Sequence, residues 1–390
     1  MTRTEPLEFG VNYTPREGWF HSWLDLDIAS VTCDFEAIAG LGLDHVRLFP
    51  LWPLLQPSRG HISGRAVADL MKVVDAAGQA GLKVSVDVLN GHLSSYDFVP
   101  SWLSTWHQRN LFNDLDVISA EAQLVAELAG QLSTRPHATG ICLGNEFAQF
   151  AAPRHPQQSV LTHEEADHWL VTLLAEAERV FPHARHVHSF DDDIWFVDKH
   201  PFTPQQAVSR GSVTTVHSWI FGGVGPLYGE GHPALTAFAR YLLELAQAWS
   251  PDPERPIWRQ EIGAPITHVR PEHAQIFLES TLVQVADMPT LQAVTWWCSH
   301  DVNRSLPDFP ELEYSLGLFD AQGRRKPIAE QFAEMLPDLR RVSPSTAERP
   351  RISFRATADM RSLTAPSGEL FQQWLSEHLS GRTPSLHWEP

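Results

Sequence analysis

The chain of 390 residues has little cysteine, few positive charges and no long apolar run. Its three cysteines (Cys33, Cys142 and Cys298) are an odd and small number for a disulfide framework, so a reducing compartment fits. Lys and Arg number 29 against 47 Asp and Glu, a net charge of −18 that argues against nucleic acid or anionic membrane as a partner. No segment approaches the roughly 20 apolar residues of a membrane span.

The N-terminal sequence Met-Thr-Arg-Thr-Glu-Pro is polar and lacks the apolar region of a signal peptide. We therefore expect a cytoplasmic protein whose partner is a small molecule rather than nucleic acid or membrane. The composition leaves the oligomeric state open, a homo-oligomer included.

Tryptophan, by contrast, is abundant, with 14 residues in the chain. An indole packs well in a large core, but it also offers a flat face on which a sugar ring can stack. The count therefore favours a carbohydrate ligand without requiring one.

Eight strand-like runs occur along the first 300 residues, and amphipathic segments separate most of them. The runs are 7–13, 45–49, 83–89, 140–146, 186–190, 213–219, 257–262 and 293–299. The amphipathic segments are 31–41, 66–80, 120–132, 164–180, 234–249 and 272–286. Alternating strands and helices predict parallel pairing, and eight units predict an α/β fold of the (β/α)8 (TIM) barrel type. A doubly wound open sheet is the alternative, but no glycine-rich phosphate loop follows the first strand.

A short C-terminal extension is predicted beyond the barrel, which we place at residues 1–337. Residues 338–366 are rich in Arg, Ser, Thr and Pro and indicate a linker or a surface wrap. Residues 369–379 follow with one apolar helical face, and this helix either packs back on the barrel or contacts a partner. The extension is thus 338–390.

Two of the strand-like runs end in glutamate. Asn145-Glu146 ends the fourth run, and Glu261 ends the seventh. A carboxylate is rare at the end of an apolar strand unless it is paired or functional. Barrel active sites lie at the C-terminal ends of the strands, so two such residues could supply the pair of carboxyl groups that cleaves a glycosidic bond.

The loops that follow the strands are also polar and aromatic. The third strand is followed by Asn90 and His92, and the fifth by Asp191-Asp192-Asp193. We count Asn90, His92 and Asp191 as candidate substrate-binding residues, although a solvated loop explains the aspartate run better than a cation site does.

The ordered set of these residues resembles the retaining glycosidases of clan A, and most closely glycoside hydrolase family 5, over roughly residues 8–335. The resemblance implies Glu146 as acid/base and Glu261 as nucleophile. It also implies that the substrate site includes Asn145, Arg47 in His-Val-Arg-Leu-Phe, His217, Trp219 and Trp296 or Trp297. Neighbours in sequence point to opposite faces of a strand, so one of these last two packs in the core and the other forms a platform under the sugar.

The chain departs from the family at two positions. The family commonly has Tyr two residues after the strand-six His, whereas this chain has His217-Ser218-Trp219, and an indole donates but cannot accept. Another group could therefore tune Glu261, with Tyr13, Tyr96 and Tyr228 as candidates. Strict alternation also places Arg259 on the same face as Glu261, which a bulge or a buried ion pair would resolve.

A retaining mechanism requires carboxyl groups about 5 Å apart, one protonated and one ionised. We expect Arg47 and His217 to keep Glu261 ionised, and burial beside a second carboxylate to raise the pKa of Glu146. We also expect Asn145 to donate to the 2-hydroxyl of the substrate.

Three other interpretations are weighed. A metal-dependent hydrolase could use His186 and His188 on one strand face, with His92, His217 and His300 near strand ends. No cysteine and no second close pair of histidines supports it, so no metal and no cofactor is predicted. A sugar-binding barrel without activity would be expected to have lost one of the two glutamates. The carboxylates could also be structural ion-pair members.

The loops after the strands resemble a family 5 branch that removes β-mannose from short glycans, including mannosyl-β-1,4-N-acetylglucosamine. They are less like the open cleft of a cellulase. This resemblance implies a β-mannosidase that acts on a small oligosaccharide. An endo-acting β-mannanase or β-glucanase is the alternative.

Overall fold

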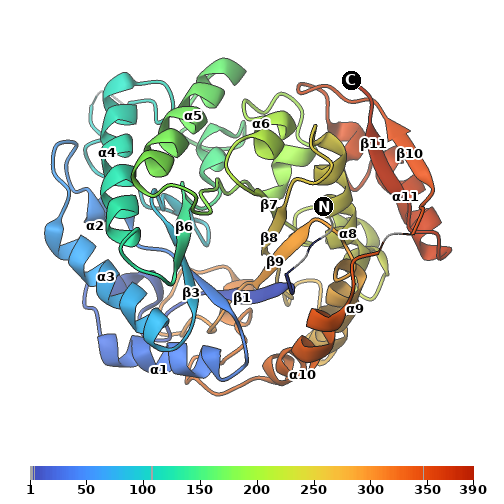
Figure 1. The fold of residues 1–390 in the computed structure, drawn as a ribbon, viewed down its shortest axis with the longest axis horizontal. Coiled ribbons are helices and arrows are strands. Elements are labelled where there is room, and N and C mark those ends of the chain that lie inside the picture. The colour runs from blue at the N-terminus through green and yellow to red at the C-terminus, as the bar shows by residue number, and fades with distance from the viewer. Residues whose placement is uncertain (1–2, 4, 107–108, 346) are drawn as a thin grey trace.

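The computed structural model describes residues 3, 5–106, 109–345 and 347–390. Seven parallel strands form one curled sheet in the order β6-β3-β2-β1-β9-β8-β7. They are β1 (Glu8–Asn12), β2 (His45–Leu48), β3 (Lys83–Asp87), β6 (Ala138–Cys142), β7 (Thr214–His217), β8 (Ile257–Glu261) and β9 (Leu291–Trp296). The sheet lies at the centre of the molecule with helices around it, which confirms the predicted barrel (Figure 1).

The predicted strand at 186–190 is the exception, because only a single bridge between Val187 and Cys142 is formed there. Toward β6, the Val187 amide donates to Ile141 O at 2.9 Å, and the Leu143 amide donates to Val187 O at 2.9 Å. Toward β7, a side chain replaces the backbone ladder, since the Thr215 hydroxyl donates to His188 O at 2.9 Å. This segment fills the eighth position of the barrel without being a regular strand.

The helices that cover the barrel fall close to the predicted segments. They are α1 (Ile28–Ala39), α3 (Gly64–Gln79), α4 (Leu115–Leu132), α5 (His163–Val180), α6 (Pro204–Ser209), α8 (Ala234–Trp249), α9 (Ala274–Val285) and α10 (Pro327–Arg341). Two shorter helices are α2 (Trp52–Leu55) and α7 (Val224–Tyr228). The helices α6 and α10 were not predicted: the first is short and the second contains Pro337.

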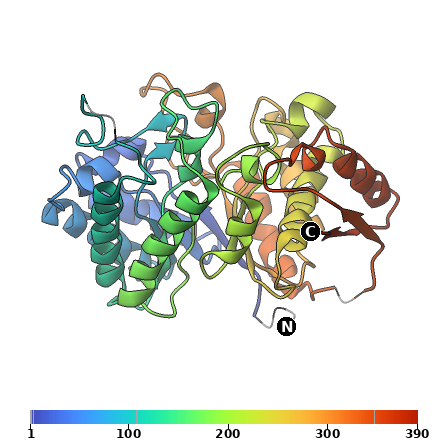
Figure 2. The same ribbon diagram turned by 90° about the horizontal axis from the view of Figure 1, so that it is seen from above.

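The C-terminal extension is more structured than its composition indicates. The boundary predicted at residue 337 falls inside α10, and a parallel pair of strands, β10 (Arg351–Phe354) and β11 (Ser385–Trp388), encloses α11 (Glu369–Leu379). Phe371 and Trp374 of α11 pack on Tyr241 of α8, with ring centroids 4.8 and 5.4 Å away. Figure 2 shows the extension, in red, at the side of the barrel next to α8.

A change of register near the end of β8 accounts for Arg259. Val216 of β7 pairs with Arg259 but His217 pairs with Glu261, so one extra residue of β8 is accommodated there. The predicted bulge is therefore present, and it interrupts the alternation that placed Arg259 on the face of Glu261. Its Nε donates to the Ser218 hydroxyl at 3.1 Å, and burial lowers its pKa to about 9.

Among the described residues, every helix is too short or too polar to cross a lipid bilayer.

Candidate active site

A cavity of about 570 Å³ opens at the C-terminal ends of the strands. Glu146 and Glu261 both line it, together with residues from the loops that follow β3, β6, β7 and β9. Of the residues predicted to bind substrate, five also line it: His92, Asn145, Asp191, Trp219 and Trp297.

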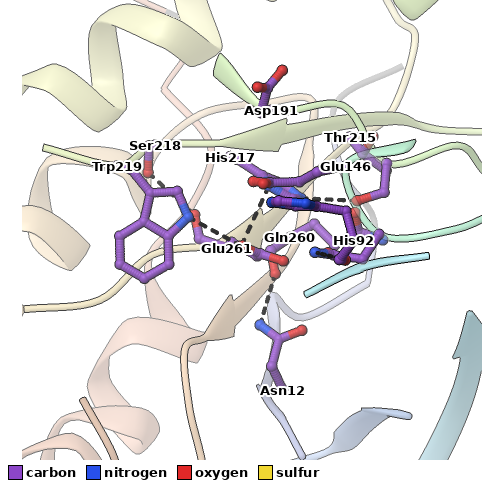
Figure 3. Close-up of polar contacts among 12 residues, drawn as sticks. Asn12, His92, Glu146, Asp191, Thr215, His217, Ser218, Trp219, Gln260 and Glu261 are labelled. Carbon is purple, nitrogen blue, oxygen red and sulfur yellow. Dashed lines mark hydrogen bonds and ion pairs between the residues drawn. The ribbon is translucent and has the colours of Figure 1, made fainter. Parts of the chain in front are cut away.

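The side chains of Glu146 and Glu261 face one another (Figure 3). Glu261 is the last residue of β8, whereas Glu146 lies four residues beyond β6, with its backbone in the left-handed region at φ 43°. A non-glycine residue is rarely stable in this region unless its surroundings hold it, and such residues concentrate at functional sites. One oxygen of each carboxylate and one nitrogen of His217 lie within 4.8 Å of one another. This separation matches the retaining geometry.

Arg47, on β2, lies fully buried beneath Glu261 and connects the polar residues at the bottom of the cavity. Its Nη1 donates to Glu261 Oε1 at 2.8 Å, and its Nη2 to Asn145 Oδ1 at 2.8 Å. A bidentate pair with Asp87, at 2.8 and 2.6 Å, fixes the plane of the guanidinium. The placement of Arg47 beside Glu261 is that expected from the sequence, whereas Asp87 was not predicted.

Trp219 occupies the position that the family commonly gives to Tyr. Its indole Nε1 donates to Glu261 Oε2 at 3.0 Å. The three candidate tyrosines bond elsewhere: Tyr13 to Asp34, Tyr96 to Pro307 O and Tyr228 to Pro366 O. Trp219 therefore makes the contact expected of the family's Tyr, since an indole N–H can donate to a carboxylate oxygen as a phenol O–H does.

His217 lies between the two carboxylates. Its Nδ1 is 2.7 Å from Glu146 Oε1 and 3.3 Å from Glu261 Oε2. On the other side of the ring, Nε2 is 3.0 Å from the Ser189 hydroxyl and 3.3 Å from Gln260 Oε1. With Nδ1 protonated, the ring donates mainly to Glu146.

The pKa shifts of the two glutamates are opposite to the expected ones. Burial raises the pKa of Glu261, and the charge of Glu146 adds to this against the lowering by His217, Arg47 and Trp219. Burial also acts to raise the pKa of Glu146, but the hydrogen bond and charge of His217, with the charges of His92 and Arg47, leave that pKa lowered. For His217, burial lowers the pKa, while Glu261 and Glu146 together raise it above 6.5. These directions favour a proton on His217 over one on Glu146.

The sequence suggested that the run Asp191–Asp193 is a solvated loop, and the structure shows that it is not. All three residues line the cavity, and Asp191 is buried. Arg154, from the loop after β6, forms ion pairs with Asp191, at 3.2 Å, and with Asp193. Burial and the charge of Glu146 raise the pKa of Asp191 to about 7, against the opposing effect of Arg154.

Two predicted residues lie away from the cavity. Asn90 is fully buried and is not among the residues that line it, because the chain turns tightly at Leu89–Gly91 and packs against Phe150. Trp296 is also fully buried and packs on Phe332 of α10 at 6.3 Å. Trp297 is the tryptophan of this pair that faces the cavity, as alternation requires.

Three of the histidines that suggested a metal site contact other groups. The ring of His186 contacts Phe181 O at 2.8 Å, that of His188 contacts Ala207 O at 3.0 Å, and His300 Nδ1 contacts the Ser299 hydroxyl at 3.1 Å. In the described part of the chain, only Glu146, His217 and Glu261 group as three metal-ligand side chains, and they already bond to one another.

Several residues that line the cavity were missed by the sequence interpretation. They are Ser94, Asp97, Gln149, Arg154, His155 and Glu313. Their loops have no periodic pattern from which a side-chain direction follows. Asp87 could have been found, since it ends an apolar strand with a carboxylate just as Glu261 does.

Comparison with known proteins identifies the family. No family model matches the chain, and no curated protein matches it. Among solved structures, a GH5_18 protein from Streptomyces cattleya in complex with GlcNAc is 45% identical over 99% of this chain and 94% of its own, with a TM-score of 0.96. A Glu-to-Ala variant from the same organism, in complex with Manβ1-4GlcNAc, is 45% identical over 98% and 94% of the two chains, with a TM-score of 0.96.

A GH5_18 protein from Bifidobacterium longum subsp. infantis is 43% identical over 99% of this chain and 92% of its own, with a TM-score of 0.96. These identities hold over nearly the whole length of both partners. The chain therefore belongs to glycoside hydrolase family 5, in the group GH5_18.

Proposed function

We propose that this protein is a retaining β-mannosidase that cleaves short oligosaccharides such as Manβ1-4GlcNAc. The observation that carries the proposal is the pair of carboxylates within 4.8 Å at the end of the barrel, with Glu261 held by Arg47 and Trp219. The Manβ1-4GlcNAc complex of a relative at 45% identity supports the choice of substrate.

The reaction takes two displacements. Glu261 attacks the anomeric carbon of the mannosyl ring while Glu146 gives a proton to the departing oxygen, which leaves an ester between sugar and Glu261. Glu146 then takes a proton from water, which attacks the anomeric carbon and releases Glu261. Arg47 and Trp219 hold the Glu261 carboxylate in place in both steps.

His217 supplies the proton that Glu146 needs. The hydrogen bond from His217 Nδ1 to Glu146 Oε1 is 2.7 Å long, so moving the proton along it gives a neutral imidazole and a carboxylic acid. Loss of the positive charge beside Glu146 also raises the pKa of that acid, which favours the protonated form.

Asn145 is placed to contact the substrate. Its Oδ1 accepts from Arg47, and its Nδ2 donates to His92 O at 3.2 Å. An amide has two N–H groups, so one remains for a hydroxyl of the sugar.

A covalent label tests the assignment. A 2-deoxy-2-fluoro mannoside with a good leaving group should accumulate as an ester, because fluorine destabilises the charged transition states of both steps. Peptide mapping should find the added mass on Glu261, in the fragment that contains Trp258. A label on another residue would show that the nucleophile is misassigned, and a wild-type enzyme inactive on every β-mannoside of a glycoside panel would overturn the substrate.

A cytoplasmic location and a homo-oligomer stay predictions. The low cysteine content supports the first: all three cysteines are unpaired, and two are buried. Fractionation of cells and light scattering of the purified protein test the two points separately.

A further inference from the structure

The cavity contains a third carboxyl group for which the mechanism above has no use. Glu313 lies on the short 3-10 helix Glu311–Tyr314, in the loop after β9. Only 7% of the residue is exposed, although it lines the cavity. Its neighbour Glu311 faces solvent instead and pairs with Arg304. The helix thus presents one carboxylate to solvent and the other to the cavity.

Three polar atoms around Glu313 are buried and have no hydrogen-bond partner among the residues that the structure describes. They are Oε2 of Glu313, Nε1 of Trp297 and the hydroxyl oxygen of Ser94. All three residues line the cavity. The indole and the hydroxyl lie near enough to the carboxyl to lower its pKa, although neither makes a hydrogen bond of normal geometry to it. Buried polar groups are nearly always bonded, so three unpaired ones on one wall point to a ligand group that completes them.

The two chain segments that carry Ser94 and Glu313 are packed together. Ser94 lies at the tip of the hairpin between β4 (His92–Leu93) and β5 (Tyr96–Asp97), with φ 50° in the left-handed region. The ring of Tyr96 packs at 5.1 Å on that of Phe309, which precedes the helix of Glu313. Phe20 contacts both rings, at 5.2 and 5.3 Å. This aromatic packing fixes the separation of Ser94 and Glu313.

The packing around Trp297 indicates which sugar of the substrate meets this wall. The Trp297 ring packs on that of Trp219, with ring centroids 6.4 Å apart, and the Trp219 indole donates to Glu261 Oε2 at 3.0 Å. The Trp297 amide also donates at 2.7 Å to the carbonyl of Ile262, the residue after Glu261. The wall that includes Trp297 and Glu313 is therefore next to the nucleophile, and the ring that becomes attached to the nucleophile faces it.

We propose that Glu313, together with Ser94 and Trp297, binds a hydroxyl group of the sugar ring that Glu261 attacks. Glu313 is thus a specificity-determining residue. The inference rests on the proposed function only in that a sugar ring occupies the cavity. A hydroxyl group suits the three partners, because it accepts from the indole or serine and exchanges a second hydrogen bond with the carboxyl. A site built in this way discriminates against an analogue that lacks the hydroxyl.

The test is a cycle of one enzyme substitution and one substrate deletion. Glu313→Ala and Glu313→Gln are compared with wild type on p-nitrophenyl β-mannoside and on its 3-, 4- and 6-deoxy analogues. We expect wild type to lose about 10- to 100-fold in kcat/KM on one analogue, and Glu313→Ala to lose a similar factor on the parent, as for a hydrogen bond to a charged group. On that analogue the two enzymes should differ by less than about 3-fold, because the shared contact is already missing.

Glu311→Ala, on the outer side of the same helix, is the matched control and should keep wild-type discrimination. Thermal unfolding of each variant verifies that it is folded, and Glu313→Gln keeps the shape of the side chain. Equal losses by Glu313→Ala on all four substrates, or no loss on any of them, would overturn the inference.

The proposed substrate and the proposed role of Glu313 can be overturned independently. A wild-type enzyme that ignores β-mannosides but cleaves another glycoside overturns the proposed substrate. The same cycle, run with deoxy analogues of the sugar that it does cleave, then still confirms or overturns the role of Glu313.

Discussion

The polar side chains at the floor and at the rim of the cavity differ in how fully they are hydrogen-bonded to the protein. At the floor, which we define as Arg47, Asn145, His217 and Glu261, each side chain is bonded to protein partners. At the rim, defined as Ser94, Asp191, Trp297 and Glu313, each side chain has one buried polar atom with no partner in the described part of the chain. Both sets line or support the same cavity.

The difference separates two tasks. A floor whose side chains are held by protein partners is rigid before substrate arrives, so its charges need no reorganisation during the reaction. A rim with open positions is completed only by a ligand, and a wrong ligand leaves it incomplete. Substitutions at the floor should therefore slow every substrate, whereas substitutions that act through the rim should change binding and selectivity.

The largest effect is expected for the acid/base. Glu146→Ala should lower kcat/KM by about 10²- to 10⁴-fold on substrates with poor leaving groups, and far less on 2,4-dinitrophenyl glycosides. Added azide should restore turnover and give a β-glycosyl azide, because the anion attacks the Glu261 ester without base help. An α-azide product, identified by NMR, would contradict the assignment of the two glutamates.

His217 should give the next largest effect, and it should depend on pH. Because the pKa of His217 is raised above 6.5, its proton is present below that value and is lost only as the pH rises through the raised pKa. Wild-type activity should therefore fall on the alkaline side, above pH 6.5. In His217→Asn this limb should move to lower pH, since the acid is then a carboxyl group alone.

The pH profile of kcat/KM on a poor leaving group measures this limb, and 2,4-dinitrophenyl glycosides serve as the internal control because they need no acid. A limb that stays in place in His217→Asn would show that the proton belongs to Glu146 from the start.

Trp219 should have a smaller effect, which acts through the floor residue Glu261. Trp219→Phe keeps an aromatic ring but removes the N–H that donates to Glu261 at 3.0 Å, so kcat/KM should fall about 10-fold. Trp219→Tyr introduces the residue common in the family and should recover part of the loss through its O–H. A Trp219→Phe enzyme as active as wild type would mean that Arg47 alone orients the nucleophile.

Sequence reasoning located the floor better than the rim for a physical reason. Arg47, His217 and Glu261 lie within strands, where alternation and the barrel direction fix the end to which each side chain belongs. Glu313 and Arg154 lie in loops, and contacts between distant segments decide their direction. Asn90 shows the same limit for a residue that was predicted. It follows a strand end and was expected to bind substrate, but a tight turn removes it from the cavity.

The charge distribution was the other point that sequence could not provide. Which carboxylate receives the proton depends on whether His217 lies at 2.7 or 3.3 Å from it, a difference of 0.6 Å that no residue pattern encodes. Similarly, composition indicated a linker or a surface wrap at residues 338–366, and it could not show the strand β10 or the contacts of the buried Arg361.

Substitution of the buried Arg361 should have the smallest effect on activity. It tests the rim although Arg361 is not itself a rim residue. Arg361 donates to three carbonyl groups of the segment that follows Asp191: Ile194 O at 2.8 Å, Phe202 O at 3.1 Å and His200 O at 3.2 Å. Asp198 of that segment accepts in return from the backbone of Ser362 at 2.8 Å. The C-terminal extension therefore holds the loop that carries Asp191 and Asp193.

Arg361→Met should leave these carbonyl groups unpaired, at a cost of about 2–4 kcal/mol in the free energy of unfolding. Because the displaced loop belongs to the rim, KM for a disaccharide should rise a few-fold while kcat changes little, a split that a general loss of folded protein would not produce. Arg355→Met is the matched control, since Arg355 is exposed in the same extension and pairs with Glu389. A fall in kcat with unchanged KM would instead connect the extension to the floor, and the separation of floor and rim would not hold.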